Sequence, residues 1–422
     1  MPLSHLVAFV FYSALILLWV GVRVTHAEVS ASAAVVLSGL AIVAGSFLLT
    51  WSAEAAERDI PQAFALGILA LIIVIPEYAV DMYFAWAAST RPEYLHYPTA
   101  NMTGANRILI GWGWALIALL YMLRNRKPAL KLESPRRIEL SFLYVATLYS
   151  FIIPLKGTLS LADAVIFLFL FALYVRCLAR SEHEESDLVG PALTLAEMPA
   201  RQRRGLVGFF MVLAGVGIFL SAEPFSEGLI ALGKAHGIDP YLLVQWVAPL
   251  ASEAPELIIA TILTLKSRPS AAFGALISSK VNQWTLLVGM LPIAFNLSSV
   301  VKGATSGGQF WTHVLPLDPH QRDEMFLTSA QSLFAAVVLS DFVIAWWEAV
   351  LLFGLFTFQM LVPMFYASPA VDETIRVGCA YVYLALAAVF SLSSGSRRRG
   401  LADSLTCFLA CSGVRFRPPR AP

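Results

Sequence analysis

Two glutamates three residues apart, Glu253 and Glu256, lie inside a long apolar stretch of the chain. This spacing puts both carboxylates on one face of a helix, and the apolar residues around them place them deep in a hydrophobic span. Lys280 and Asn282 lie within the next apolar stretch. Because ionisable side chains at such a depth are costly and usually mark an ion pathway, residues 247–283 predict ion chemistry inside a bilayer.

The composition of the whole chain also requires a membrane. Of its 422 residues, 58% are hydrophobic and 14% are charged, and the mean hydropathy is +0.72. Such a chain cannot bury its apolar side chains in one soluble core, so we predict an all-α polytopic protein surrounded by the lipid bilayer. The net charge of +1 gives no reason to expect a nucleic-acid partner. The oligomeric state is left open by the sequence.

Windows of about 20 apolar residues predict twelve membrane-spanning helices. Their predicted ranges are 4–24, 31–51, 62–89, 105–123, 139–155, 160–178, 205–222, 241–265, 271–297, 324–339, 342–365 and 373–393. The first of them has a second interpretation as a signal peptide, since Thr25-His26-Ala27 resembles a weak cleavage site. No Lys or Arg precedes its apolar run, which favours a retained helix.

The distribution of basic residues predicts the orientation. With the loops assigned alternately to two sides, 20 Lys and Arg residues fall on the side of the carboxyl-terminal tail, eight fall on the other side, and Lys280 lies within a helix. The positive-inside rule therefore predicts that both termini are cytoplasmic. We expect a multi-pass protein of the plasma membrane, the inner membrane of a bacterium.

Short motifs recur in the same order in the two halves of the chain. The matched pairs are Ser52-Ala53-Glu54 with Ser221-Ala222-Glu223, Pro76-Glu77 with Pro255-Glu256, and the acids Glu139 and Asp163 with Glu324 and Glu348, both 24 residues apart. The two units, 31–179 and 205–366, each hold five predicted helices, and an odd number turns the second unit upside down relative to the first. The sequence thus predicts an inverted repeat.

The repeat sets the predicted domain boundaries. The segments are an extra helix (1–30), the first repeat (31–179), a cytoplasmic linker (180–204), the second repeat (205–366), a second extra helix (367–396) and a basic cytoplasmic tail (397–422).

Inverted repeats place substrates near the membrane midplane, where interrupted helices of the two halves meet. Pro76 and Pro255 each remove a backbone donor from a predicted helix, which frees carbonyl groups one turn earlier. Glu77 and Glu256 follow directly. Two carboxylates with carbonyl and amide oxygens form a hard-oxygen metal site that suits calcium or sodium. The alternative is a buried pair of acids that serves only the fold.

At these residues the chain resembles the calcium/cation antiporter superfamily, which includes sodium/calcium and calcium/proton exchangers. That family has two inverted repeats, each with a Gly-Thr-Ser-x-Pro-Glu motif followed by Gly-Asn-x-x-Gly-Ser-Asn. The corresponding segments here are Pro76-Glu77 with 100–106, and 252–256 with 274–280. The resemblance implies that Glu77 and Glu256 are the central ion-binding residues, supported by Asn101, Asn106 and Ser252.

Several positions depart from the family pattern. Ile73 and Val74 stand where the family has Thr and Ser, Ala275 replaces an Asn, and Lys280 stands at the last Asn of the second motif. Asp81 and Glu253 are additional acids. These departures leave the coupling ion open.

The additional residues have two interpretations each. Asp81 either lines the ion cavity or pairs with Lys280, and Glu253 either carries a proton or is a second partner of that lysine. We hypothesise that Lys280 itself gains or sheds a proton during transport. Asn282 either replaces the missing amide or forms a hydrogen bond between packed helices.

The sequence therefore predicts a secondary active antiporter that exchanges calcium or another cation for sodium or protons by alternating access. Its partners would be inorganic cations, and we expect neither a cofactor nor enzymatic activity. One alternative is a monovalent sodium/proton antiporter. Others are an intramembrane hydrolase, although the chain has neither an HExxH motif nor a nucleophile elbow, and a membrane protein that binds an ion without transporting it.

Overall fold

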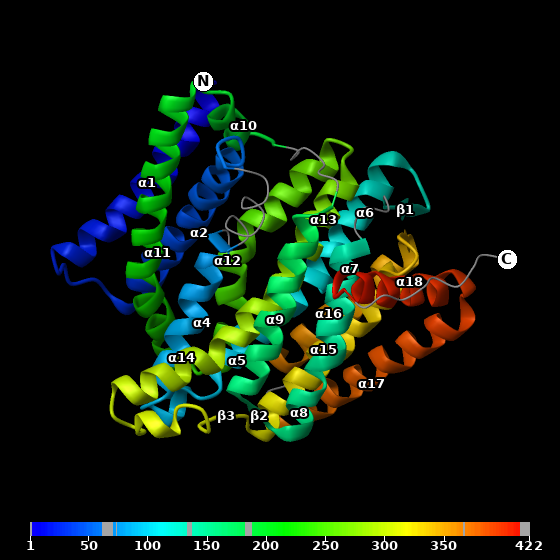
Figure 1. The fold of residues 1–422 in the computed structure, drawn as a ribbon. Coiled ribbons are helices and arrows are strands. Elements are labelled where there is room, and N and C mark those ends of the chain that lie inside the picture. The colour runs from blue at the N-terminus through cyan, green and yellow to red at the C-terminus, as the bar shows by residue number, and fades with distance from the viewer. Residues whose placement is uncertain are drawn as a thin grey trace. The chain divides into compact units, whose positions relative to one another are not determined.

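The protein is almost entirely helical in a computed structural model (Figure 1). The structure describes residues 2–60, 71–72, 74–132, 137–181, 188–365 and 368–413. Within these ranges, ten helical segments are long and apolar enough to cross a membrane. The prediction of an all-α polytopic membrane protein is therefore confirmed.

The predicted total of twelve spans stays a prediction. The range 62–89 lies partly outside the described residues. The range 324–339 does form a helix, α15, but α15 is not among the ten apolar segments found in the described residues.

The chain divides into two compact units, and each draws on both predicted repeats. The first unit comprises Met1–Ala105, Ala179–Ile259 and Leu297–Ser306. The second comprises Asn106–Leu178, Ala260–Asn296 and Gly307–Pro422. Helices α5 (Tyr97–Ile108), α12 (Pro240–Leu265) and α14 (Val288–Val301) contribute residues to both.

The other elements belong to one unit each. Those of the first are α1 (Leu3–Val24), α2 (Ala31–Ala56), α4 (Ile75–Ala88), η1 (Pro92–Tyr94), α10 (Pro191–Ala196) and α11 (Ala200–His236). Those of the second are η2 (Leu109–Trp114), α6 (Ala115–Asn125), β1 (Ala129–Lys131), α7 (Arg137–Ser150), α8 (Ile152–Lys156), β2 (Thr158–Leu159), α9 (Leu161–Leu178), α13 (Pro269–Asn282), η4 (Gln283–Leu287), η5 (Gly307–Gln309), β3 (Leu315–Pro316), α15 (Pro319–Leu339), β4 (Val343–Ala345), α16 (Trp346–Phe365), α17 (Pro369–Ser393) and α18 (Gly395–Cys411).

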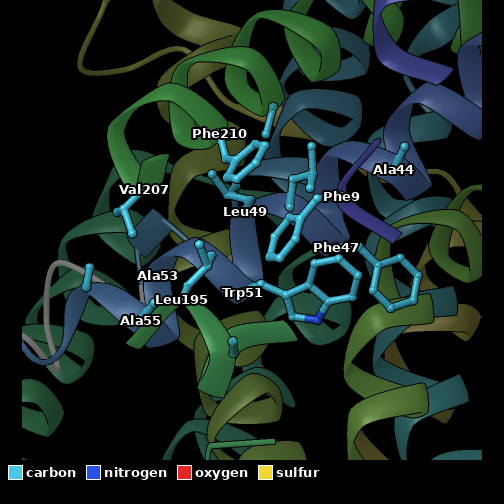
Figure 2. Packing of buried hydrophobic residues seen from close by; sticks show 14 of the residues in the cluster. Phe9, Ala44, Phe47, Leu49, Trp51, Ala53, Ala55, Leu195, Val207 and Phe210 are labelled. Carbon is cyan, nitrogen blue, oxygen red and sulfur yellow. The ribbon is translucent and has the colours of Figure 1, made fainter. Parts of the chain in front are cut away.

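Small residues allow the long helices α2 and α11 of the first unit to pack closely. A Cβ atom added at Gly45 would lie 2.7 Å from Ile218 Cγ1, and one at Gly228 would lie 2.3 Å from Val35 Cγ2. Such positions let helix backbones approach one another within a bilayer. Beside them, Phe9 of α1 stacks on Phe210 and meets Trp51 edge-on (Figure 2). This aromatic cluster anchors α1 to the α2 and α11 pair.

Four short strands in the second unit repeat the predicted symmetry. β1 pairs with β4, and β2 pairs with β3, both antiparallel. The shift of 185 residues that carries Asp163 to Glu348 also carries β2 onto the start of β4, and it carries β1 to within one residue of β3. Each strand therefore pairs across the two repeats in an equivalent manner.

The backbone adds a second sign of symmetry. α5 passes into a π-helical turn, η2, and α13 passes into another, η4. Asn106 and Lys280, which occupy matching positions in the two motifs, each lie three residues before such a turn. π-Helical turns widen a helix locally and are frequent at functional sites.

Helix α11 is longer than the range expected for it. α11 continues to His236 and contains 37 residues, so Glu223 and Glu227 lie inside it rather than after it. A helix of that length extends about 55 Å at 1.5 Å per residue and thus exceeds the hydrocarbon core of about 30 Å. The predicted range covers only the apolar part of α11, and the helix continues beyond it to His236.

Pro76 also differs from its expected role. It lies in the first turn of α4 rather than inside a helix, whereas Pro255 is inside α12 as expected. A proline fits a first turn because the backbone donor it lacks would have no partner there.

Candidate ion-binding site

Helices α4, α5 and α12 bring the expected acids of the first unit together. Glu77 lies in the first turn of α4, and Asp81 follows one turn later. α5 lies close to α12, because a Cβ atom at Gly104 would be 1.8 Å from the backbone oxygen of Gln245. Only glycine fits at this contact, which holds the helix of Asn101 against the helix of the two other glutamates.

We call Glu77, Asp81, Glu253 and Glu256 the carboxyl cluster. Glu77, Asp81 and Glu253 are no more than 3% exposed, and Glu256 is half-buried. The Glu77 and Glu253 carboxyl groups are close enough to interact. Two buried carboxylates beside each other repel, and a proton shared between them or a cation bound by them would remove this repulsion.

Asp81 has a different partner. Its Oδ1 atom accepts a hydrogen bond of 2.9 Å from Nδ2 of Asn101, which is also buried. An amide donor can satisfy a carboxylate without adding a charge. Asp81 is thus held by a neutral group on the neighbouring helix α5.

Several buried oxygens of this region receive no hydrogen bond from the described residues. They are Glu77 Oε1, Asp81 Oδ2, Asn101 Oδ1 and Glu256 Oε2. A buried acceptor without a donor is unfavourable unless a ligand supplies the missing interaction. Hard cations such as calcium and sodium bind this set of carboxylate and amide oxygens.

The arrangement is nevertheless not a closed metal cage. In the described ranges, no three acidic, histidine or cysteine side chains are close enough to hold one metal ion. Ser252 Oγ donates to the backbone oxygen of Pro249 at 3.2 Å, so its hydroxyl group forms a hydrogen bond within α12. Several carboxylates of the cluster could bind one cation together only after their side chains move.

The second unit contains a different polar group, formed by Lys280 and Asn106. Lys280 is fully buried, and its Nζ atom donates to both the backbone oxygen and Oδ1 of Asn106, each at 2.7 Å. The ammonium also lies 5.4 Å from the centre of the Trp284 ring, within cation–π range. The amide oxygen expected to bind a transported ion is therefore occupied by a fixed cation.

Asn282 follows this lysine by two residues and is the last residue of α13. Its side chain is 4% exposed, and its Oδ1 atom receives no hydrogen bond from the described residues. Both interpretations of Asn282 remain predictions, and so do the pairings of Lys280 with Asp81 or Glu253.

The acids that match across the repeats, Asp163 and Glu348, have structural roles. Asp163 accepts from the backbone nitrogen of Ser160 at 2.7 Å, and Glu348 accepts from that of Ala345 at 2.8 Å. Both bonds run three residues back at the start of a helix, where they satisfy an otherwise unpaired donor. These acids are caps, and we exclude them from the candidate site.

A buried ion pair next to Asn106 escaped the sequence analysis. Arg107, which is 2% exposed, pairs with the buried Glu324 of α15, and Arg376 of α17 lies 3.9 Å from the same carboxylate. Arg107 is the third residue of the predicted span 105–123, a position typical of a basic residue at the membrane surface. The sequence signal for a buried role of Arg107 was its position directly after the motif residue Asn106.

Glu227 is also bound rather than solvated. It accepts hydrogen bonds from Tyr83 of α4, from Arg91 at 2.6 Å and from Tyr94 at 2.5 Å. These contacts tie the helix of Glu77 to α11. Glu227 therefore connects these helices and has a structural role.

Comparisons with known proteins place the chain in a family. The family model described as sodium/calcium exchanger protein matches residues 30–179 and 206–365. The two matched segments correspond closely to the two predicted repeats. No curated protein sequence matches the chain.

Solved structures give the same result. The H+/Ca2+ exchanger CAX is 40% identical, with a TM-score of 0.88 over 98% of this chain and 100% of that one. The sodium-calcium exchanger NCX_Mj, soaked with sodium and strontium, is 16% identical with a TM-score of 0.51, over 79% of this chain and 98% of that one, and shows the shared fold. The chain therefore belongs to the sodium/calcium exchanger protein family, within the calcium/cation antiporter superfamily.

Proposed function

We propose that this protein exchanges calcium for protons across the membrane. The observation that carries this proposal is the proximity of the Glu77 and Glu253 carboxyl groups, which a shared proton would stabilise. That proton would compete with the cation that the family motif predicts for Glu77. The 40% identity to the H+/Ca2+ exchanger CAX supports the same coupling ion.

The exchange would follow from competition for the same oxygens. When calcium enters, Glu77 gives up the proton it shares with Glu253, Glu256 gives up its own proton, and both carboxylates coordinate the ion while the two protons leave to the side from which calcium came. When protons return from the other side, the contact re-forms and calcium is released. Buried carboxylates cannot stay ionised without a partner, so the two ligands replace each other rather than leave the cluster empty.

Asp81 and Asn101 would complete the coordination. Each has one buried oxygen without a donor among the described residues. Calcium takes six to eight oxygen ligands, more than two glutamates provide. Asn106, in contrast, would act indirectly, because Lys280 already binds its side-chain oxygen.

Lys280 supports protons over sodium as the coupling ion. Its ammonium stands at the motif position where the family has a neutral amide, so it would disfavour a second bound cation in its surroundings. We further propose a transporter without a resident cofactor or catalytic activity, in the plasma membrane with both termini cytoplasmic.

The test is calcium uptake into proteoliposomes, driven separately by a pH gradient and by a sodium gradient. We expect uptake with the pH gradient alone, and its loss in Glu77→Gln and Glu256→Gln. Glu93→Gln, at an exposed position of η1, is the matched control. Uptake with the sodium gradient alone would contradict proton coupling. Sodium-driven proton flux without calcium movement would support the monovalent alternative.

A further inference from the structure

A groove on the first unit has no role in the proposed transport cycle. It has a volume of about 380 Å³ and lies between α1, α10 and α11. Its lining residues are Leu6, Phe9, Val10, Ser13, Ala14, Leu17, Leu195, Leu206, Phe209 and Phe210, nearly all apolar. Leu17 is 55% exposed and Phe209 56%, so the walls of the groove are open to the bilayer.

The length of the groove fits half of a bilayer. On α1 its lining extends from Leu6 to Leu17, which is about 16 Å at 1.5 Å per residue. One leaflet contributes about 15 Å of the hydrocarbon core. The groove therefore matches one extended acyl chain and is too short for a membrane-spanning helix.

One end of the groove is polar. His5 and Thr194 directly precede two of the lining residues, Leu6 and Leu195, and their side chains form a hydrogen bond of 2.7 Å. Leu206, which lines the same end, follows the first turn of α11. The polar end therefore coincides with the start of α11.

That start carries a concentration of positive charge. Arg203 and Arg204 both donate to Asp59, at 2.7 to 2.8 Å, and Arg201 is exposed beside them. With Arg58 counted beside these three arginines, and Glu57 and Glu197 counted beside Asp59, the cationic groups outnumber the anionic ones by four to three. Arginines just outside the hydrocarbon region attract anionic lipid head groups.

We propose that this groove binds an anionic phospholipid of the bilayer, with one acyl chain along α1 and its head group at the first turn of α11. The apolar groove would favour an acyl chain, and the arginines would favour a negatively charged head group. A second copy of the protein fits less well, because the polar end would then have to be covered by an acidic surface.

The test measures binding and needs no transport activity. Purified protein is titrated with phosphatidylglycerol or phosphatidylcholine, and the bound lipid is counted by native mass spectrometry while Tm is recorded. We expect tighter binding and a larger Tm increase with phosphatidylglycerol. Equal binding of the two lipids to the unmodified protein would overturn the proposal.

Two variants separate the two parts of the site. Ala14→Phe fills the groove, with Val212→Phe as its control on the exposed side of α11. Arg201→Gln removes head-group charge, with Lys234→Gln near the far end of α11 as its control. We expect roughly tenfold weaker phosphatidylglycerol binding in each test variant only. Unchanged binding in Ala14→Phe, or a protein dimer that this variant disrupts, would overturn the proposal.

Discussion

The carboxyl cluster and the Lys280–Asn106 pair each combine residues of both repeats, the first at the Pro-Glu motifs and the second at the last position of the motifs that follow, yet their chemistry is opposite. Glu77, Asp81 and Glu256 of the cluster have buried oxygens that receive no hydrogen bond from the described residues, whereas in the other group a buried ammonium donates to two oxygens of Asn106. A symmetric backbone, with matching π-helical turns, thus carries an asymmetric charge distribution. One group is suited to exchange its ligand, and the other contains a cation that cannot leave.

The largest effect is expected from a change that removes the shared proton. In Glu253→Gln, the amide can donate to Glu77 permanently, so a proton is no longer needed at this contact. We expect calcium transport driven by a pH gradient to fall roughly 100-fold, the range associated with loss of a positioned proton-transfer group. Initial uptake rates in proteoliposomes measure this. Retention of full pH-driven transport would show that the cluster and the proton are unrelated.

The next change removes the fixed cation. Lys280→Met deletes the donor to Asn106 O and Oδ1, and leaving such buried acceptors unpaired costs about 1–3 kcal/mol. We expect a lower Tm in detergent than that of the unmodified protein.

Lys280→Asn is the sharper form of the same experiment. It restores the family's amide, can still donate to Asn106, and should admit sodium. We expect sodium-driven calcium uptake to appear and proton coupling to weaken. Proton coupling that stays unchanged in Lys280→Asn would remove Lys280 from the coupling mechanism.

A smaller effect is expected inside the cluster. In Asp81→Asn the interaction with Asn101 becomes neutral and one negative ligand is lost. We expect the KM for calcium to rise roughly tenfold, equivalent to about 1.4 kcal/mol, while the coupling ion stays the same. Uptake measured over a range of calcium concentrations gives this value. No change in KM would place Asp81 outside the coordination of the cation.

Much of the fold was predictable from the sequence because a bilayer leaves a strong apolar signal. The continuous helical stretches that contain Pro255 and Lys280, Pro240–Leu265 and Pro269–Val301, were predicted to within four residues of their ends. Polar helix starts gave no such signal, and α5 begins at Tyr97, eight residues before the predicted range. α18 was read as a basic tail because its apolar residues are interrupted by charges.

The candidate site was predictable only as a set of residues. Repeated Pro-Glu motifs pointed to Glu77 and Glu256, but spacing along the chain cannot reveal which side chains meet across helices. The Glu77–Glu253 contact and the capture of Asn106 by Lys280 both depend on helix packing. Arg107 was missed for the same reason, since its partner Glu324 is far away in sequence.

The smallest expected effect concerns an acid of the first unit that lies outside the bilayer. Hydrogen bonds from Arg203, with further contributions from Arg204, hold the pKa of Asp59 well below its usual range. A carboxylate with a lowered pKa stabilises the fold above its unfolded pKa of about 3.9, and this contribution is lost as the pH falls towards the folded value. Asp59→Asn should therefore lower the free energy of unfolding by about 1 kcal/mol at pH 6 to 8, and the difference should shrink below about pH 4. Tm measured for both proteins across this pH range checks the sign. If the stability difference between the two proteins instead grows in acid, the arginines do not hold Asp59 ionised. Asp59 would then no longer differ from the carboxyl cluster in being stabilised by hydrogen-bond donors.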